Sequence, residues 1–107
     1  MKYDIHITTR AERDISEAWD YIAHELLNPD AADRFLDSIE KAVRSLQEMP
    51  DRFRIIDDKV LQYWGIRFIR AGKYLIFYTI SEDDGCVYII RVLYEKRNWI
   101  MILGGEC

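Results

Sequence analysis

Apolar and polar residues alternate at the start of the chain and then change to a helical spacing. Tyr3, Ile5 and Ile7 alternate with polar residues, which is the period-two pattern of a half-buried strand. In the two segments that follow, apolar residues recur every three or four positions, as on one face of an amphipathic helix. The first stripe is Ala11, Ile15, Ala18, Trp19, Ile22 and Leu26, and the second is Phe35, Ile39, Ala42, Val43 and Leu46. The pattern predicts one strand followed by two helices.

Capping and helix-stopping residues mark the ends of these helices. Thr9 and Glu12 match a capping box, in which the threonine hydroxyl accepts from the backbone N–H three residues later. Asn28 before Pro29 is typical of a second helix start, and Pro50 stops that helix. We expect the polar side chains outside the first apolar stripe to face solvent; they are Arg13, Asp14, Glu17 and Asp20.

The last third of the chain contains three strand-like segments, Ile66–Arg70, Tyr74–Ile80 and Val87–Tyr94. Gly72-Lys73 and Asp84-Gly85 provide turn residues between them. The predicted order is β-α-α-β-β-β in one domain that spans residues 1–107. This order is typical of an α+β fold, an antiparallel sheet with the N-terminal helical hairpin packed on one face.

Both faces of the last two predicted strands are apolar, although a helical hairpin covers only one face of a sheet. Residues 51–65 look irregular, and the C-terminal tail around Trp99–Leu103 is short for covering a sheet. Either the tail covers the second face or that face is left for a partner protein, and we favour the partner because the tail is short. The candidate partner-binding residues are Tyr74, Ile76, Tyr78, Tyr88, Ile90 and Trp99.

Charge is distributed unevenly along the chain, which carries a net charge of −4. Residues 1–51 hold 6 basic and 12 acidic side chains, and residues 52–107 hold 9 basic and 7 acidic ones. The second half could therefore present a basic face to a polyanion, because local fields steer binding more than net charge does. The alternative is that these basic residues only form an ordinary solvated surface.

Composition excludes several classes of protein. Half of the residues are apolar, which is typical of a folded domain. The two cysteines, Cys86 and Cys107, form neither a disulfide framework nor a metal spacing, and they suit a reducing cytoplasm. No apolar run approaches the length of a membrane span, and the start does not resemble a signal peptide. We expect a cytoplasmic protein that does not bind membranes.

Few residues suggest catalysis. His6 and His24 lie far apart without a third ligand, so we expect no metal and no other cofactor. No strained serine elbow and no glycine-rich phosphate loop is present. What remains is a group of cations and aromatics on the strands and their ends: Arg67, Arg70, Lys73, Arg91, Tyr94, Lys96 and Arg97.

This group could cleave RNA through its 2′-hydroxyl, since that reaction needs a base, cations near the phosphate and an acid for the leaving oxygen. Strand-end cations that merely flank a core explain the pattern about as well. Arg91 shares a strand parity with Val87, Ile89 and Leu93, so its charge needs a carboxylate partner or a bound anion.

Seven fragments, in this order and spacing, make the chain resemble the RelE/ParE superfamily of toxins from bacterial type II toxin–antitoxin systems. The resemblance covers residues 3–103. The helical fragments are Ala11-Glu12-Arg13-Asp14-Ile15, Tyr21-Ile22-Ala23, Pro29-x-Ala31-Ala32-x-x-Phe35 and Leu46-x-x-Met49-Pro50. The strand fragments are Ile66-Arg67-x-Ile69, Tyr74-Leu75-Ile76-Phe77-Tyr78 and Arg91-Val92-Leu93-Tyr94-x-x-Arg97-Asn98-Trp99.

The resemblance implies a small toxin that a cognate antitoxin wraps and inactivates, in a possible toxin–antitoxin hetero-oligomer. ParE-like members poison DNA gyrase, whereas RelE-like members cut mRNA on the ribosome. Leu75 stands where RelE-like proteins often have arginine, Tyr94 stands where many have histidine, and Arg97 matches a widespread arginine.

The resemblance therefore favours ParE-like action on gyrase. An alternative is a metal-independent, ribosome-dependent mRNA endoribonuclease, and a third is a non-toxic binding module of the same fold. If the chain is a nuclease, the candidate catalytic residues are Arg67, Arg70, Arg91, Tyr94 and Arg97.

Overall fold

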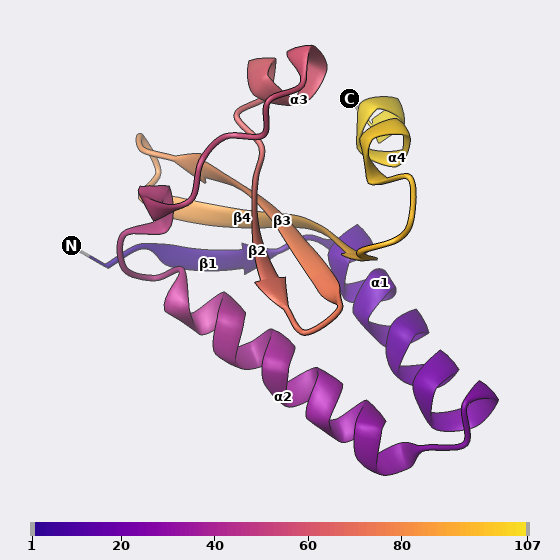
Figure 1. Cartoon of the computed structure of the whole chain (residues 1–107). Coiled ribbons are helices and arrows are strands. Elements are labelled where there is room, and N and C mark those ends of the chain that lie inside the picture. Colours follow the sequence, from indigo (N-terminus) through magenta and orange to yellow (C-terminus); the bar gives the residue numbers. More distant parts are fainter. Residues whose placement is uncertain (1, 107) are drawn as a thin grey trace.

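The computed structural model describes residues 2–106 and confirms the α+β class. The helices are α1 (Thr9–Asp20), α2 (Pro29–Ser45), α3 (Lys59–Tyr63) and α4 (Trp99–Glu106). The strands are β1 (Asp4–Ile7), β2 (Arg67–Ala71), β3 (Tyr74–Ser81) and β4 (Cys86–Tyr94). Figure 1 shows the long helices α1 and α2 together on one side of the sheet.

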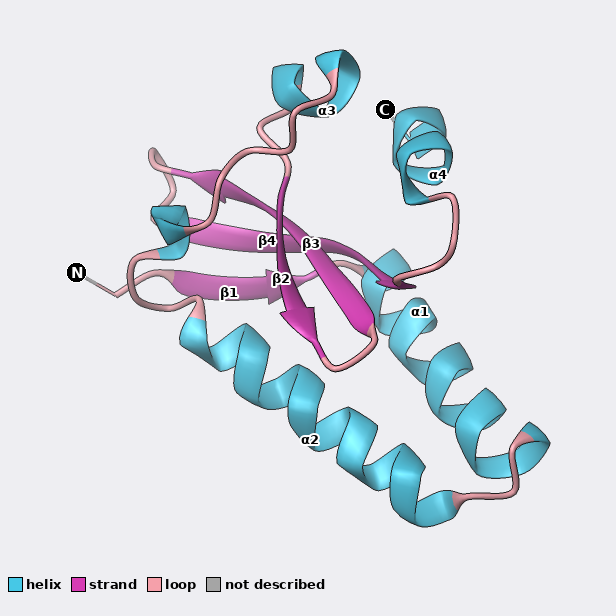
Figure 2. Ribbon diagram, viewed as in Figure 1, coloured by secondary structure: helices cyan, strands magenta, loops and turns pink. Residues whose placement is uncertain are grey.

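The four strands form one sheet in the order β1-β4-β3-β2. The last three strands pair antiparallel, as predicted, but β1 pairs parallel with β4. The sheet is therefore mostly antiparallel, and the parallel pair at this edge is a feature that the sequence did not indicate. The physical reason is the helical hairpin, which returns the chain across the sheet before β2 begins (Figure 2).

The helix ends agree with the predicted caps with one shift. The hydroxyl of Thr8, rather than that of Thr9, accepts from the backbone N–H of Ala11 at 3.2 Å, so the capping box predicted at Thr9 is wrong by one residue. Asn28 caps α2 as predicted, by accepting from Ala31 N–H at 3.1 Å. Between the two helices, Tyr21–Glu25 widens into a π-helical turn that the apolar stripe did not reveal.

The sheet has a hydrophobic core on each face. The core on the hairpin face includes Ile39, Ile76, Tyr78 and Ile89. On the opposite face, α3 and α4 cover a second core, which consists of Leu61, Ile66, Leu75, Phe77, Leu93 and Leu103. The expectation that this second face would be left for a partner is wrong, because residues 59–63 and 99–106 form helices that bury it.

A β-bulge in the central pair of strands changes which face each residue of β4 occupies. Phe77 pairs with Arg91 and Tyr78 pairs with Ile89, so Ile90 is the extra residue. As a result Ile89 lies in the first core and Leu93 in the second. The regular alternation of faces assumed for Arg91 from the sequence is therefore interrupted at the bulge.

Candidate functional site

The five residues predicted as catalytic do not come together at one place. Arg91 is buried, with 3% of its surface exposed, and its guanidinium is paired with Asp14 on α1. Arg91 Nε donates to Asp14 Oδ2 at 2.7 Å, and Arg91 Nη2 donates to Asp14 Oδ1 at 3.0 Å. The carboxylate partner that the sequence required for Arg91 is therefore Asp14.

Asp14 was expected to face solvent, and that expectation is wrong. Its carboxylate also accepts from the backbone N–H of Val92 at 3.0 Å and lies 4.0 Å from Nε of Arg10. Ala11 and Ala18, one turn to either side of Asp14, leave room for the carboxylate to approach β4. The signal that could have found it was the unmatched charge of Arg91 in an apolar strand.

Arg67 and Arg70 are both engaged within the chain, at the other edge of the sheet. Arg67 Nη1 donates to the carbonyl oxygens of Asp51 (3.3 Å) and Phe53, and so ties the segment after α2 to β2. Arg70 forms an exposed ion pair with Glu95. Neither arginine shares a pocket with Tyr94 and Arg97 among the described residues.

Tyr94 and Arg97 do come together, in a groove between α1 and the end of β4. The groove has a volume of about 750 Å³. Tyr74 and Tyr94 contact each other edge to face at 5.7 Å between ring centroids, and Tyr74 packs on Phe35 at 4.7 Å. We call this hollow the tyrosine groove. Its walls are Asp14, Glu17, Ala18, Tyr21, Ile22, Leu26, Ala31, Lys73, Tyr74, Val92, Leu93, Tyr94 and Arg97.

The tyrosine groove contains a phenol with a shifted pKa and side chains of both charges. Burial raises the pKa of Tyr74 above its ordinary value of 10.0, and the neighbouring phenols of Tyr94 and Tyr21 raise it further. The Tyr74 phenol therefore keeps its proton at neutral pH. Lys73 and Arg97 add positive charge, and Asp14 and Glu17 add negative charge, to a groove that is otherwise lined by aromatic and aliphatic side chains.

The residues predicted to bind a partner also separate. Ile76 and Tyr78 are wholly buried beneath the helical hairpin, where a partner cannot reach them in the folded chain. Burial raises the pKa of Tyr78 to about 12, with opposing effects from Arg67 and Arg52, and its hydroxyl donates to the Pro50 carbonyl at 2.6 Å.

The other four partner candidates are partly exposed at different places. Tyr74 lines the tyrosine groove. Tyr88 contacts His6 at 5.5 Å on the parallel edge of the sheet, and Ile90 lines a hollow beside Trp64. Trp99 packs its ring on Phe77 at 5.5 Å and thereby anchors α4.

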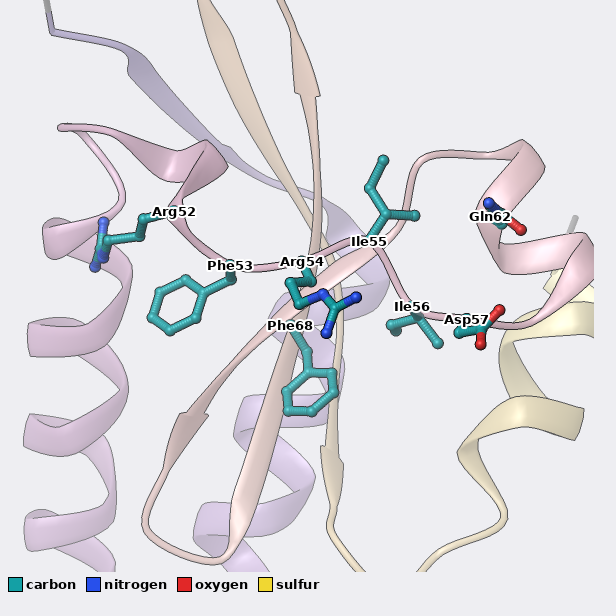
Figure 3. Close-up of a pocket in the computed structure, with 8 residues that line it drawn as sticks. All are labelled: Arg52, Phe53, Arg54, Ile55, Ile56, Asp57, Gln62 and Phe68. Atoms are coloured by element: carbon teal, nitrogen blue, oxygen red, sulfur yellow. The ribbon is translucent and has the colours of Figure 1, made fainter.

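A third hollow, of about 780 Å³, lies where the segment after α2 passes β2. Figure 3 shows Arg54 and Phe68 in its middle, with Arg52 toward α2 and Asp57 toward α3. The guanidinium of Arg52 is already bonded within the chain, because it donates to the carbonyls of Ser45, Glu48 and Met49 at the end of α2. This hollow brings together none of the predicted catalytic residues.

Two further findings concern metal binding and membrane-spanning helices. Within residues 2–106, no cluster of three histidine, cysteine, aspartate or glutamate side chains is arranged to hold a metal ion. In the same part of the chain, no helix has both the length and the apolar character needed to cross a membrane.

Comparison with known proteins gives a match over most of the chain. A family model described as "ParE toxin of type II toxin-antitoxin system, parDE" matches residues 5–99. No curated protein sequence is significantly similar to the chain.

Two solved structures have similar folds. One is the chromosomal ParDE toxin–antitoxin system from P. aeruginosa, with a TM-score of 0.70 and 15% identity over 87% of this chain and 96% of that one. Another is the RelBE2 toxin–antitoxin complex from Mycobacterium tuberculosis, with a TM-score of 0.63 and 25% identity over 88% and 92% of the two chains.

Proposed function

The chain belongs to the family of ParE toxins of type II toxin–antitoxin systems, since the family model spans residues 5–99, and we propose that it stops growth by binding DNA gyrase in the cytoplasm. We propose further that a cognate antitoxin neutralises it within a toxin–antitoxin hetero-oligomer. One of the similar structures is of a toxin–antitoxin system and the other is of a toxin–antitoxin complex, which supports a partner of this kind.

The observation that favours gyrase binding over RNA cleavage is the separation of the cations. Cleavage at a 2′-hydroxyl needs a base, an acid and cations around one phosphate. Arg67, Arg70 and Arg91 are instead bonded to carbonyls or carboxylates of the chain itself, at places outside the tyrosine groove. Inhibition by binding needs no such convergence.

The tyrosine groove is the best candidate for the antitoxin-binding site. Its walls offer aromatic rings and aliphatic side chains that suit the apolar face of a helix or an extended segment. Lys73 and Arg97 sit at the strand end of the groove, where they would favour acidic residues in that segment. Of the partner residues predicted from the sequence, Tyr74 belongs to this surface.

The test measures two activities of the purified chain side by side. Supercoiling of relaxed plasmid by gyrase is expected to be inhibited, while mRNA in a reconstituted translation system stays intact. Addition of the antitoxin is expected to restore supercoiling. Cleaved mRNA together with unimpaired supercoiling would reverse the assignment.

The second candidate is a ribosome-dependent mRNA endoribonuclease. It is favoured by the 25% identity to a chain of the RelBE2 complex and by the meeting of Tyr94 and Arg97 in one groove. If the chain is a nuclease, Tyr94→Phe and Arg97→Ala each abolish toxicity while the fold survives. If it binds gyrase, Tyr94→Phe keeps most of its toxicity, because the ring remains and only the hydroxyl is lost.

A further inference from the structure

The tip of the helical hairpin carries an unusual leucine. Leu27 has a φ of 51°, in the left-handed region, where a β-carbon crowds the backbone and glycine or asparagine is the usual residue. It follows the π-helical turn Tyr21–Glu25, and the N–H of Asn28 closes the turn on the Ile22 carbonyl at 3.2 Å. Strained residues and π-helical turns both concentrate at functional sites.

The fold gains little from this leucine. Leu27 is 82% exposed and belongs to neither hydrophobic core. Its neighbour Leu26 is 56% exposed and lines the tyrosine groove, whereas Leu27 is not among the groove residues. The side chain of Leu27 is therefore free to contact another protein, and the charge around it distinguishes it from other exposed residues with a left-handed backbone.

The charge around the tip indicates what kind of surface it meets. Residues 20–34 contain four acids, Asp20, Glu25, Asp30 and Asp33, and one arginine, Arg34. This acidic segment repels nucleic acid but complements a basic protein surface. Enzymes that handle DNA carry such basic surfaces, because they neutralise phosphates with lysine and arginine.

We propose that the hairpin tip is the surface that engages the target protein, with Leu27 entering an apolar pocket bordered by basic side chains. The proposal rests on the proposed function, because it takes the target to be a DNA-handling enzyme. It assigns separate surfaces to the two partners: the convex tip to the target and the concave tyrosine groove to the antitoxin. A convex apolar tip fits a pocket on a large protein, whereas a groove fits a segment.

Met49 supplies a matched control for Leu27. It also has a left-handed backbone, with a φ of 48°, and it is 69% exposed. It lies at the opposite end of α2, where its carbonyl accepts from Arg52 Nη1 at 3.2 Å, so its surroundings include a cation. Asparagine tolerates the left-handed region, so Leu27→Asn and Met49→Asn are both expected to keep or raise the Tm.

The first experiment measures gyrase inhibition, antitoxin affinity and toxicity for both variants. Leu27→Asn is expected to raise the concentration needed for half-inhibition of gyrase by about tenfold or more and to lose toxicity, with antitoxin affinity unchanged. Met49→Asn is expected to match the wild type in all three. Full potency of Leu27→Asn, or an equal loss of antitoxin affinity, would overturn the proposal.

The second experiment tests the charge. Glu25→Lys places a cation at the end of the π-helical turn that follows α1, which suits the helix dipole, and is expected to weaken gyrase binding more at low salt than at high salt. Asp83→Lys makes the same charge change in the exposed turn after β3 and is expected to have no effect. Equal effects of the two variants would show that gyrase binding depends on the net charge of the chain and not on the acidic segment at the tip.

These experiments separate the tip proposal from the proposed function. If the wild-type chain is toxic but leaves gyrase active, the gyrase assignment fails, and Leu27→Asn must still lose toxicity for the tip to remain the target surface. Toxicity retained by Leu27→Asn in that case overturns the tip proposal as well. A wild-type chain without toxicity overturns both.

Discussion

Arg91 and Arg97 lie six positions apart, yet the fold gives them opposite surroundings. Arg91 is buried inside β4 and bonded to Asp14, whereas Arg97 lies beyond the strand, exposed at the edge of the tyrosine groove. A charge that is satisfied inside the chain stabilises one arrangement of α1 on the sheet. A charge that lies at an open groove is available to a partner. The same residue type is therefore part of the folded core in one place and lies at an open groove in the other.

Because of this difference, a list of the cationic residues in the sequence does not by itself identify a catalytic site. Five residues suit phosphate chemistry by type, but only Tyr94 and Arg97 share a surface. The other three contribute to the packing of loops, strands and helices on the sheet. The following predictions test this division between fold and surface, from the largest expected effect to the smallest.

Removal of the buried ion pair is expected to have the largest effect. Asp14→Ala leaves the Arg91 guanidinium in the core without this carboxylate and removes the acceptor of Val92 N–H. Breaking such a buried pair costs about 3–5 kcal/mol. Urea unfolding of the purified variant, followed by circular dichroism, measures the loss.

A double variant separates the cost of an isolated charge from the value of the pair. Asp14→Leu with Arg91→Met is expected to recover much of the loss, because two apolar side chains of similar size need no charge partner. A double variant no more stable than Asp14→Ala would show that the pair itself, together with the Val92 contact, holds α1 on the sheet.

Tyr78→Phe tests a second polar group that the chain satisfies internally. It removes the hydrogen bond from the buried phenol to the Pro50 carbonyl and leaves that carbonyl without this donor. The expected loss is about 1–2 kcal/mol. The free energy of unfolding at neutral pH gives the size of the effect.

The same hydroxyl makes stability depend on pH. The pKa of Tyr78 rises from 10.0 to about 12 on folding, chiefly because of burial, so the folded state favours the protonated phenol. Its contribution is complete below pH 10 and is lost as the pH rises from 10 to 12. Unfolding of the wild type between pH 9 and 12 should therefore show a steeper decline than that of Tyr78→Phe. Parallel curves would contradict a phenol buried in this way.

The helical hairpin and the three late strands could be predicted from the sequence because their patterns are local. Apolar spacing of three to four residues, together with Asn28 and Pro29, was enough to place α1 and α2. In α3 and α4 the deciding contacts are long-range: Leu61 and Leu103 are buried only because the sheet lies beneath them. Five residues of α3 are too few for a periodic signal to be recognised.

The candidate site could be predicted only in part, for the same reason. Tyr74, Tyr94 and Arg97 lie close to one another because β3 and β4 pair in the register that places Tyr74 opposite Tyr94. The β-bulge at Ile90, which sets the face of Arg91, has no marker in the sequence. Tyr21 was missed because its place in the groove depends on how α1 crosses the sheet.

Charge reversal at the groove is expected to affect binding rather than stability. Arg97→Glu should weaken antitoxin affinity by about tenfold, or about 1.4 kcal/mol, because an acidic segment would meet a like charge. The loss should shrink at high salt, since the site is exposed to solvent. Titration calorimetry at two salt concentrations measures both. An unchanged affinity would remove Arg97 from the antitoxin surface.

The smallest effect is expected at Arg70, which resembles Arg97 in charge and exposure but already has a partner in the chain. Arg70→Ala breaks an ion pair with Glu95 in which the arginine side chain is 54% exposed. Such pairs contribute about 0.2–1 kcal/mol, because water screens them and two long side chains lose freedom. The variant should therefore unfold at nearly the wild-type urea concentration and bind antitoxin normally, since Arg70 lies outside the tyrosine groove. A large loss of antitoxin affinity at Arg70 would extend the binding surface from the end of β4 to the β2 edge of the sheet.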